Sequence, residues 1–590
     1  KTTLVNQLLR QTGAFRRGEG EVEQALDKGD LERERGITIL SKCTALDFDG
    51  YQINVVDTPG HADFGGEVER VMRMVDSVLL LVDAFDGPMP QTRFVTRKAL
   101  ARGLRPIVVI NKIDRPGCDP HAAVDAVLDL FISLDATDEQ CDFPVIYSSA
   151  KLGYAMHSLD ETPGDLSPLL RQVVEFAPPP NVDPDLSPAL QVTTFDHDAY
   201  LGSLAVGRVE SGEFHPGDRA LLVRRDGERE TFRITGLFGF RGLHRVELPR
   251  AVAGDIVAIT GMESPNVGET ITSVEAPRVL PLLEVDAPTV SVAVIANNSP
   301  TVGKEGKFVT SAKVAERLWR ETKSNVSLRV QATDSPDTHI VSGRGELHLS
   351  VLIETMRREG YEFMVSRPTV VTHVGENGET LEPYEMVTAD VENSHTGTVI
   401  EALGKRFGRV VNMRETGGGR TRIEIVIPTR ALIGYRSKFA TDTRGTGVFS
   451  SVFHEYGPFA GEIPDRGNGA LIAQEDCTTV TYAIWKLEDR GTFFVGAGVP
   501  VYAGQIIGMH TRNNDLIVNP GKTKKLTNIR AAGSDEKNFL KPYRNLSIED
   551  AIEFINDDEL VEFTPKSIRL RKRVLDHSER KRLEPKTKVG

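Results

Sequence analysis

The stretch IVVINKID at residues 107–114 decides the fold of the first third of the chain. Four apolar residues of strand type run directly into Asn111, Lys112, Ile113 and Asp114. A polar turn at the end of a buried strand is where open α/β sheets hold their ligands. The Asp114 carboxylate can accept both N–H groups of a guanine edge, whereas adenine presents a mismatched group. The stretch therefore predicts a guanine nucleotide site on an α/β sheet.

Three further motifs flank this turn. DTPG at 57–60 ends another apolar run, where an acidic residue can lie near Mg²⁺ and a glycine N–H can reach a γ-phosphate. SSAK at 148–151 follows a later strand, and its backbone amides can meet the guanine O6. KTT at 1–3 matches the end of a phosphate-binding loop, GxxxxGK[ST], although the same letters also suit an ordinary helix start. Order and spacing favour the phosphate loop.

The order KT, RGITI, DTPGH, NKID and SSAK resembles the G domain of translational GTPases. The resemblance implies that Thr38 contacts Mg²⁺ and the γ-phosphate only in the GTP state, and that His61 orients the attacking water. Taken alone, Thr38 reads as a strand residue and His61 as a structural histidine. The implied GTP/GDP-binding residues are Lys1, Thr2, Thr3, Thr38, Asp57, Gly60, Asn111, Lys112, Asp114, Ser149, Ala150 and Lys151. Thr2 and Thr38 would ligate Mg²⁺ directly, and Asp57 through water.

Changes in pattern along the chain predict a multidomain protein of α/β domains and a β-barrel. Residues 1–180 alternate strands (44–48, 53–57, 77–83, 105–111 and 144–148) with helices, which predicts a mostly parallel sheet covered on both faces. After a proline-rich linker at 177–188, we expect a small barrel at 186–285. The segments 288–372 and 382–458 read as ferredoxin-like α+β domains, and 460–590 as a mostly β domain with a basic end.

The stretch GKTKKLTNIRAAG at 521–533 resembles the BipA/TypA family, and so does the whole chain. Elongation factor G has another domain between its ferredoxin-like domains, for which residues 371–384 leave no room. The resemblance implies a C-terminal domain that reaches the peptidyl-transferase region and the acceptor end of A-site tRNA. Lys522, Lys524, Lys525 and Arg530 would contact phosphates there without reading sequence. Without the family, this stretch is a solvated basic loop.

Composition agrees with a folded protein. The 590 residues are 39% hydrophobic and 26% charged, and the longest apolar runs are strand-length, which excludes a membrane span. The net charge of −13 hides a basic end from Lys566 onward, which suits a polyanionic partner contacted at one end. Four scattered cysteines fit free thiols in the cytoplasm. The first strand and the glycines of a phosphate loop would precede Lys1, so we expect the sequence to be truncated at its start. If the molecule itself lacks them, it should bind little nucleotide.

These features predict a ribosome-associated GTPase, a monomer off the ribosome. It would bind the 70S ribosome through both subunits and rRNA, and use hydrolysis as a switch in translation control or large-subunit assembly under stress. The alternative is an assembly scaffold that binds RNA and has a non-essential GTPase. Other factors, such as LepA or a ribosomal protection protein, conflict with the basic stretch at 521–533. A metabolic ATPase conflicts with NKID.

Overall fold

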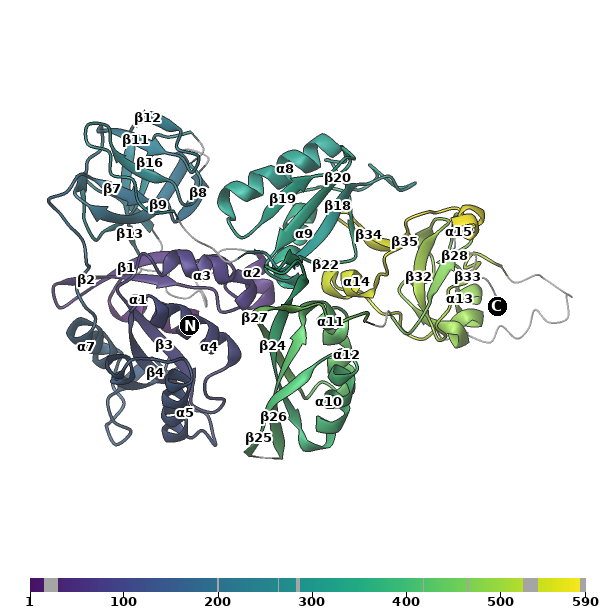
Figure 1. Ribbon diagram of the computed structural model, residues 1–590, viewed down its shortest axis with the longest axis horizontal. Helices are drawn as coiled ribbons and strands as arrows, with labels where there is room; N and C mark the ends of the chain where they lie inside the picture. The colour runs from purple at the N-terminus through teal and green to yellow at the C-terminus, as the bar shows by residue number, and fades with distance from the viewer. Residues whose placement is uncertain are drawn as a thin grey trace, which may run out of the picture. The chain divides into compact units, whose positions relative to one another are not determined.

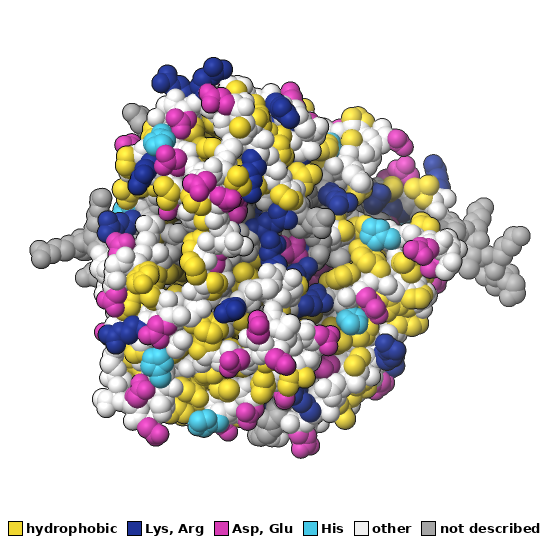
Figure 2. Space-filling view, turned by 60° about the vertical axis from the view of Figure 1, so that its left-hand side comes forward, with side chains coloured by type: hydrophobic (Ala, Val, Ile, Leu, Met, Phe, Trp, Pro, Cys, Tyr) yellow, Lys and Arg dark blue, Asp and Glu magenta, His cyan; other side chains and the backbone are white. Residues whose placement is uncertain are grey.

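The chain folds as two compact units, described by a computed structural model. Unit 1 comprises residues 1–287 with 321–327, and unit 2 comprises 288–320 with 328–590. The structure describes residues 1–14, 30–198, 201–242, 244–263, 265–282, 287–417, 419–463, 466–523 and 540–583. Within these ranges, no helix is both long and apolar enough to cross a membrane. Figure 2 shows both acidic and basic side chains on the surface of the described residues.

The first part of unit 1 contains a four-stranded sheet of order β3-β4-β5-β6. Its strands are β3 (Ser77–Asp83), β4 (Arg105–Asn111), β5 (Val145–Ser149) and β6 (Tyr154–Met156). The first three are parallel, and β6 is antiparallel to β5. Side chains of β4 are buried on both faces, as parallel sheets require.

Helices cover both faces of this sheet, as the sequence predicts (Figure 1). Val108 and Ile110 pack with α4 (Pro90–Ala101) and α5 (Pro120–Ile132). Val109, one residue out of phase, packs on the other face with α1 (Thr2–Gln11) and α7 (Ser167–Phe176). This two-residue alternation sets the position of α1, whose first residues belong to the predicted phosphate loop.

The two earliest predicted strands form, but they do not join that sheet. β1 (Lys42–Phe48) and β2 (Tyr51–Asp57) pair with each other, antiparallel, and in the described residues with no strand of the four-stranded sheet. Side chains connect the two sheets instead, because Leu4 and Leu8 of α1 share one core with Leu46 and Val109. The expectation of one sheet was wrong here, since an apolar pattern shows which residues are buried but not which strands pair.

The second part of unit 1 is a nine-stranded antiparallel sheet with its own core. Its strands are β7 (Ala189–Gln191), β8 (Thr194–Asp198), β9 (Gly202–Ser211), β11 (Arg219–Val223), β12 (Arg229–Arg233), β13 (Gly236–Arg241), β14 (His244–Glu247), β16 (Ile256–Thr260) and β17 (Thr270–Ser273). β10 (Glu213–Phe214) pairs separately with β15 (Ala251–Val252). Gly207 is required where β9 passes β7, since a Cβ there would lie 2.0 Å from the Gln191 carbonyl oxygen.

Unit 2 begins with a ferredoxin-like domain, as predicted. The elements run β18 (Val290–Ala296), α8 (Ser311–Ser324), β19 (Arg329–Ala332), β20 (Thr338–Gly343), α9 (Glu346–Arg358) and β21 (Phe363–Ser366). The strand order β19-β20-β18-β21 is that of a split βαβ fold.

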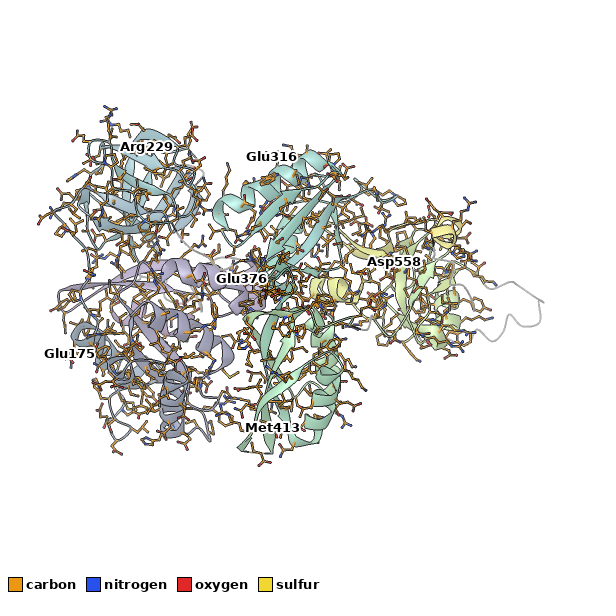
Figure 3. All side chains as sticks on the ribbon, viewed as in Figure 1. Glu175, Arg229, Glu316, Glu376, Met413 and Asp558 are labelled. Carbon is orange, nitrogen blue, oxygen red and sulfur yellow. The ribbon has the colours of Figure 1, made fainter. Side chains whose placement is uncertain are left out.

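A second ferredoxin-like domain follows, with strand order β27-β24-β26-β25. Its elements are β24 (Thr380–Glu392), α10 (Thr396–Gly404), β25 (Arg409–Gly417), β26 (Arg420–Pro428), α11 (Thr429–Leu432), α12 (Tyr435–Asp442) and β27 (Val448–Pro458). The helices α11 and α12 are separated at Gly434, which adopts a left-handed φ of 74°. Met413 on the edge strand β25 lies at the far end of this domain (Figure 3).

In unit 2, β22 (Thr369–Val370) pairs with β18, and β29 (Cys477–Thr478) pairs with β31 (Pro500–Val501) in a separate two-stranded sheet. Six further strands extend the sheet of the first ferredoxin-like domain. They are β28 (Ala470–Ala473), β30 (Gly491–Phe493), β32 (Gln505–His510), β33 (Leu516–Val518), β34 (Glu559–Phe563) and β35 (Ile568–Lys572). β34 pairs with β21 in the register Phe363 opposite Phe563, which creates one eleven-stranded sheet. In Figure 1 the yellow strands β34 and β35 lie between the teal and the light green strands. Hydrogen bonding thus continues between the segments 288–372 and 460–590.

Candidate nucleotide site

Three oxygen atoms from separate segments meet at the start of α1. Thr2 Oγ1 donates to Asp57 Oδ2 at 3.1 Å and lies 3.3 Å from Thr38 Oγ1. Asp57 is 4% exposed and ends β2, so the strand delivers its carboxylate to this point. Hydroxyl and carboxylate oxygens are the ligands that Mg²⁺ prefers. The three residues that the sequence assigns to Mg²⁺ are therefore adjacent, and their chemistry fits that ion.

Lys1 lies against the same cluster. A Cβ placed on Gly60 would be 3.4 Å from Lys1 Nζ, so the ammonium reaches the DTPG turn. Burial lowers the pKa of Lys1, while the Asp57 carboxylate opposes that effect. Lys1 is exposed as a residue, but its ammonium is partly desolvated against the protein and would be stabilised by further negative charge, which a phosphate group supplies. Thr3 is exposed on the first turn of α1.

Glu32 anchors the segment that contains Thr38, and sequence reasoning missed it. The residue is 5% exposed in α2 (Asp30–Arg35), and its Oε1 accepts the N–H groups of Ile39 at 2.9 Å and Leu40 at 3.2 Å. Its Oε2 accepts a 2.7 Å bond from Lys42. The surrounding letters, DLERER, alternate in charge and give no sign that one carboxylate is buried.

His61 follows the DTPG turn and is held by its neighbours. Its Nδ1 accepts a 3.3 Å bond from the Asp63 N–H, and the ring meets the edge of Phe64 at 6.4 Å. A neutral imidazole that accepts at Nδ1 carries its proton on Nε2. The side chain is 24% exposed, so His61 remains accessible to solvent beside Gly60.

The helix after His61 connects the site with the nine-stranded sheet. α3 (Gly65–Val71) is buried along its whole length. Val71 and Met74 share a core with Val206 and Phe238 of the sheet. A change at the DTPGH turn thus has a packed route to the second part of unit 1.

The predicted guanine turns are joined by one side chain. Asn111 Oδ1 accepts a 2.9 Å bond from the Ala150 N–H and a 3.3 Å bond from Ser148 Oγ. The NKID and SSAK turns therefore lie together at the carboxyl ends of β4 and β5. Asp114 and Lys151 are exposed at this edge, whereas Ser149 is fully buried. Asn111 and Ser149 hold the turns in place.

Lys112 is also positioned within the protein. It has a left-handed φ of 64°, and its Nζ lies 2.6 Å from Asp83 Oδ2 at the end of β3. Burial raises the pKa of Asp83, but the bond from Lys112 and the Phe85 N–H lower it overall. This ion pair orients the Lys112 stem along the edge of the sheet where the predicted guanine turns lie.

The predicted RNA contacts are only partly covered by the structure. Lys522 is exposed at the end of a described segment, and Lys524, Lys525 and Arg530 lie outside the described residues. Within the described ranges, no group of three or more His, Cys, Asp or Glu residues forms a metal site. The Mg²⁺ ligand set above differs from such a site, because two of its three groups are hydroxyls.

Comparison with known proteins identifies the parts of the chain. Family models match at residues 1–179 (Elongation factor Tu GTP binding domain), 202–272 (Elongation factor Tu domain 2), 379–467 (Elongation factor G C-terminus) and 468–577 (TypA/BipA C-terminal domain). A relative in Escherichia coli (strain K12) is 52% identical over 583 residues, 99% of this chain and 96% of the relative. The chain belongs to the BipA/TypA family.

Two further relatives support the same family. Those of Haemophilus influenzae and Synechocystis are 52% and 50% identical, over 99% and 97% of this chain and 95% and 96% of their own lengths. All three relatives carry the name large ribosomal subunit assembly factor BipA. A crystal structure from Thermus thermophilus shares the fold at 18% identity, with a TM-score of 0.51 over 78% of this chain and 95% of that one.

The predicted family and fold class are thus confirmed: this BipA/TypA member carries a GTPase domain of the elongation factor Tu type. The domain boundaries and the roles of individual site residues stay predictions.

Proposed function

We propose that this BipA/TypA member is a ribosome-stimulated GTPase whose hydrolysis step switches its conformation during large-subunit assembly or translation. The observation that carries the proposal is the meeting of Thr2, Thr38 and Asp57 beside Lys1. Relatives at 52% identity, named for large-subunit assembly, support the ribosome as partner, which places the protein in the cytoplasm.

The residues divide the work of phosphoryl transfer between binding and positioning. Lys1 would bind the β- and γ-phosphates, Thr2 and Thr38 would ligate Mg²⁺, and Asp57 would contact the ion through a water molecule. When bound, Mg²⁺ supplies positive charge against the phosphate oxygens. His61 orients a water whose oxygen attacks the γ-phosphorus, while the bond to the bridging oxygen breaks and GDP leaves with inorganic phosphate.

Guanine recognition belongs to the two turns joined by Asn111. Asp114 accepts the guanine N–H groups, and the backbone N–H groups of the SSAK turn donate to O6. Lys112 and Lys151 flank the base, with Lys112 oriented by Asp83.

Loss of the γ-phosphate provides the switch. Thr38 then loses its partner, and the segment is released up to its anchor at Glu32. The route from the DTPGH turn through α3 carries the change to the nine-stranded sheet. At the other end of the chain, Lys522, Lys524, Lys525 and Arg530 contact rRNA and the acceptor end of A-site tRNA through phosphates.

The decisive experiment measures GTP hydrolysis by the full-length protein with and without 70S ribosomes. We expect strong stimulation in the wild type, a loss of about 10²- to 10⁴-fold in His61→Ala, and no change in His157→Ala, an exposed histidine of the same domain. If ribosomes do not stimulate hydrolysis by the wild type, the proposal is wrong. If His61→Ala retains the stimulation, a residue other than His61 must orient the attacking water.

A second experiment tests the RNA contacts. Ribosome binding by a Lys522/Lys524/Lys525 triple alanine variant should weaken. The slope of the logarithm of its binding constant against the logarithm of the salt concentration should become less steep by about 2 to 3 units. A triple alanine variant at the exposed residues Lys304, Lys313 and Lys405 is the control. Equal salt slopes for the two variants would show that the basic stretch does not contact the ribosome.

The assembly scaffold remains the second candidate, supported by the names of the relatives. It predicts that His61→Ala still promotes formation of complete large subunits in cells that lack the wild-type protein. A subunit profile with accumulated precursors in that variant would instead tie assembly to hydrolysis.

A further inference from the structure

Unit 2 contains a cleft of about 260 Å³ that the GTPase function does not use. It lies where α9, β32 and the turn between β34 and β35 meet. Its apolar lining includes Phe494, Ile506 and Leu570, and its cations are Arg357, Lys566 and Arg569. The described residues that line it include no carboxylate. The cleft thus combines a hydrophobic surface with positive charge.

One side chain on its wall is almost fully buried as a residue but has a donor without an internal partner. Gln505 is 3% exposed, and its Oε1 accepts a 3.2 Å bond from the Tyr502 N–H. Its Nε2 has no hydrogen-bond partner in the part of the chain that the structure describes. Because Gln505 lines the cleft, a ligand or water in the cleft can supply the acceptor that this donor needs. The amide is therefore suited to a polar ligand edge.

The cations differ in how far they are already neutralised. Arg569 is paired with Glu305 and Glu562. Arg357 uses Nε for the Thr564 carbonyl at 2.8 Å and Nη1 for Glu354 at 2.6 Å, and its Nη2 makes no hydrogen bond within the described ranges. Lys566 is exposed and forms no ion pair among the described residues. Lys566 and Arg357 Nη2 can therefore receive an anion.

We propose that this cleft binds one nucleoside monophosphate unit. The base lies on the apolar lining, Gln505 Nε2 donates to an acceptor on the base edge, and Lys566 with Arg357 binds the phosphate. Ligand pockets usually enclose about 300–1,000 Å³, so this cleft suits a single unit rather than an extended chain. The same chemistry comes from a free nucleotide or from an unpaired nucleotide in RNA. None of these residues belongs to the GTP site, so the inference stands independently of hydrolysis.

The test uses the full-length protein saturated with GDP, so that the GTP site is filled. Calorimetry with CMP and with AMP measures mononucleotide binding, and fluorescence anisotropy with a labelled single-stranded RNA hexamer measures RNA binding. We expect saturable binding that weakens about tenfold in Lys566→Ala and in Gln505→Leu. Lys581→Ala on α15 (His577–Leu583) is the matched control and should bind as the wild type.

The two ligand arms separate the sources. Tighter binding of the hexamer than of the mononucleotides assigns the cleft to RNA, and the reverse assigns it to a free nucleotide. No saturable binding of either ligand overturns the proposal. So does binding that Lys566→Ala leaves unchanged, and this exposed substitution keeps the result interpretable if Gln505→Leu fails to fold.

Discussion

The nucleotide site of unit 1 and the Glu362–Glu562 cluster of unit 2 both gather polar groups from distant segments. The cluster consists of these two carboxylates, residues 297–306 after β18, Tyr502 and Arg569. In the proposed nucleotide site, Lys1 and Asp114 would present charge to a ligand that the chain does not supply. In the cluster, the chain supplies every partner itself.

The cluster is a dense set of internal bonds around two carboxylates that are 0% exposed. Glu562 accepts hydrogen bonds from Ser299 at 2.7 Å, Thr301 at 3.1 Å and Tyr502 at 2.7 Å. Three backbone N–H groups, of Gly303, Glu305 and Gly306, donate to Glu362 at 2.8, 3.0 and 2.5 Å.

Asn297 connects the two halves of the cluster, donating from Nδ2 to Glu362 at 3.3 Å and to Glu562 at 3.2 Å. Backbone N–H groups around an anion are also how proteins bind phosphate. Several hydrogen-bond donors that point to one place therefore indicate a ligand site only where no acceptor of the protein itself already occupies that place.

The largest effect should come from the guanine end of the nucleotide site. Asp114→Asn places a donor against the guanine N–H groups, so GTP affinity should fall by about 10⁴-fold, while XTP, which offers a carbonyl there, should bind better than GTP. Calorimetry with both nucleotides measures the reversal. Asp119→Asn is the control, because asparagine can still cap α5. Normal GTP affinity in Asp114→Asn would remove this residue from the site.

Substitutions in the Glu362–Glu562 cluster should change the stability of unit 2 and not its affinity for a ligand. Glu562→Ala leaves buried hydroxyls without their acceptor and Arg569 with Glu305 as its remaining carboxylate, which should cost about 3–5 kcal/mol in the unfolding of unit 2. Calorimetric unfolding measures the loss, and Glu376→Ala, an exposed site labelled in Figure 3, should change stability by less than about 0.5 kcal/mol. Equal unfolding temperatures for the two variants would show that the cluster contributes nothing.

A smaller effect separates anchoring from ligand contact within unit 1. Glu32→Ala frees the segment beside Thr38, so ribosome-stimulated hydrolysis should fall by about tenfold, or about 1.4 kcal/mol, with GDP affinity unchanged. Glu34→Ala on the same helix is the exposed control. A parallel loss of GDP affinity would contradict a role limited to the GTP state.

The smallest expected effect is a pH dependence in the cluster. Burial alone would raise the pKa of Glu305, but bonds from Thr564 and Arg569 lower it overall from its ordinary value of 4.5. The stabilisation is therefore complete above pH 4.5 and is lost as the pH falls through the lowered pKa. The difference in unfolding temperature between wild type and Glu305→Gln should narrow between about pH 5 and about pH 3. A difference in unfolding temperature that widens as the pH falls would contradict a lowered pKa of Glu305.

Much of the geometry of the candidate nucleotide site could be predicted because the predicted residues lie in short turns. A turn of four residues places its carboxylate and backbone N–H groups within reach of one ligand. The groups proposed to bind the nucleotide are therefore neighbours in the sequence, as in NKID and DTPG. Glu32 could not be predicted in this way. Its partners are backbone N–H groups, which every residue except proline presents, so no letter identifies them.

The sequence by itself determined the family, the order of the domains and the two ferredoxin-like patterns, because periodicity and motifs are local properties of the chain. Only the tertiary structure decided that β1 and β2 pair apart from the sheet, that β34 joins β21, and that Glu362 and Glu562 share a buried cluster. Each of these is a choice of partner between segments distant in sequence. Every residue except proline presents the same backbone N–H and C=O groups, so a strand does not identify its partner locally, and the packing of the whole unit makes that choice.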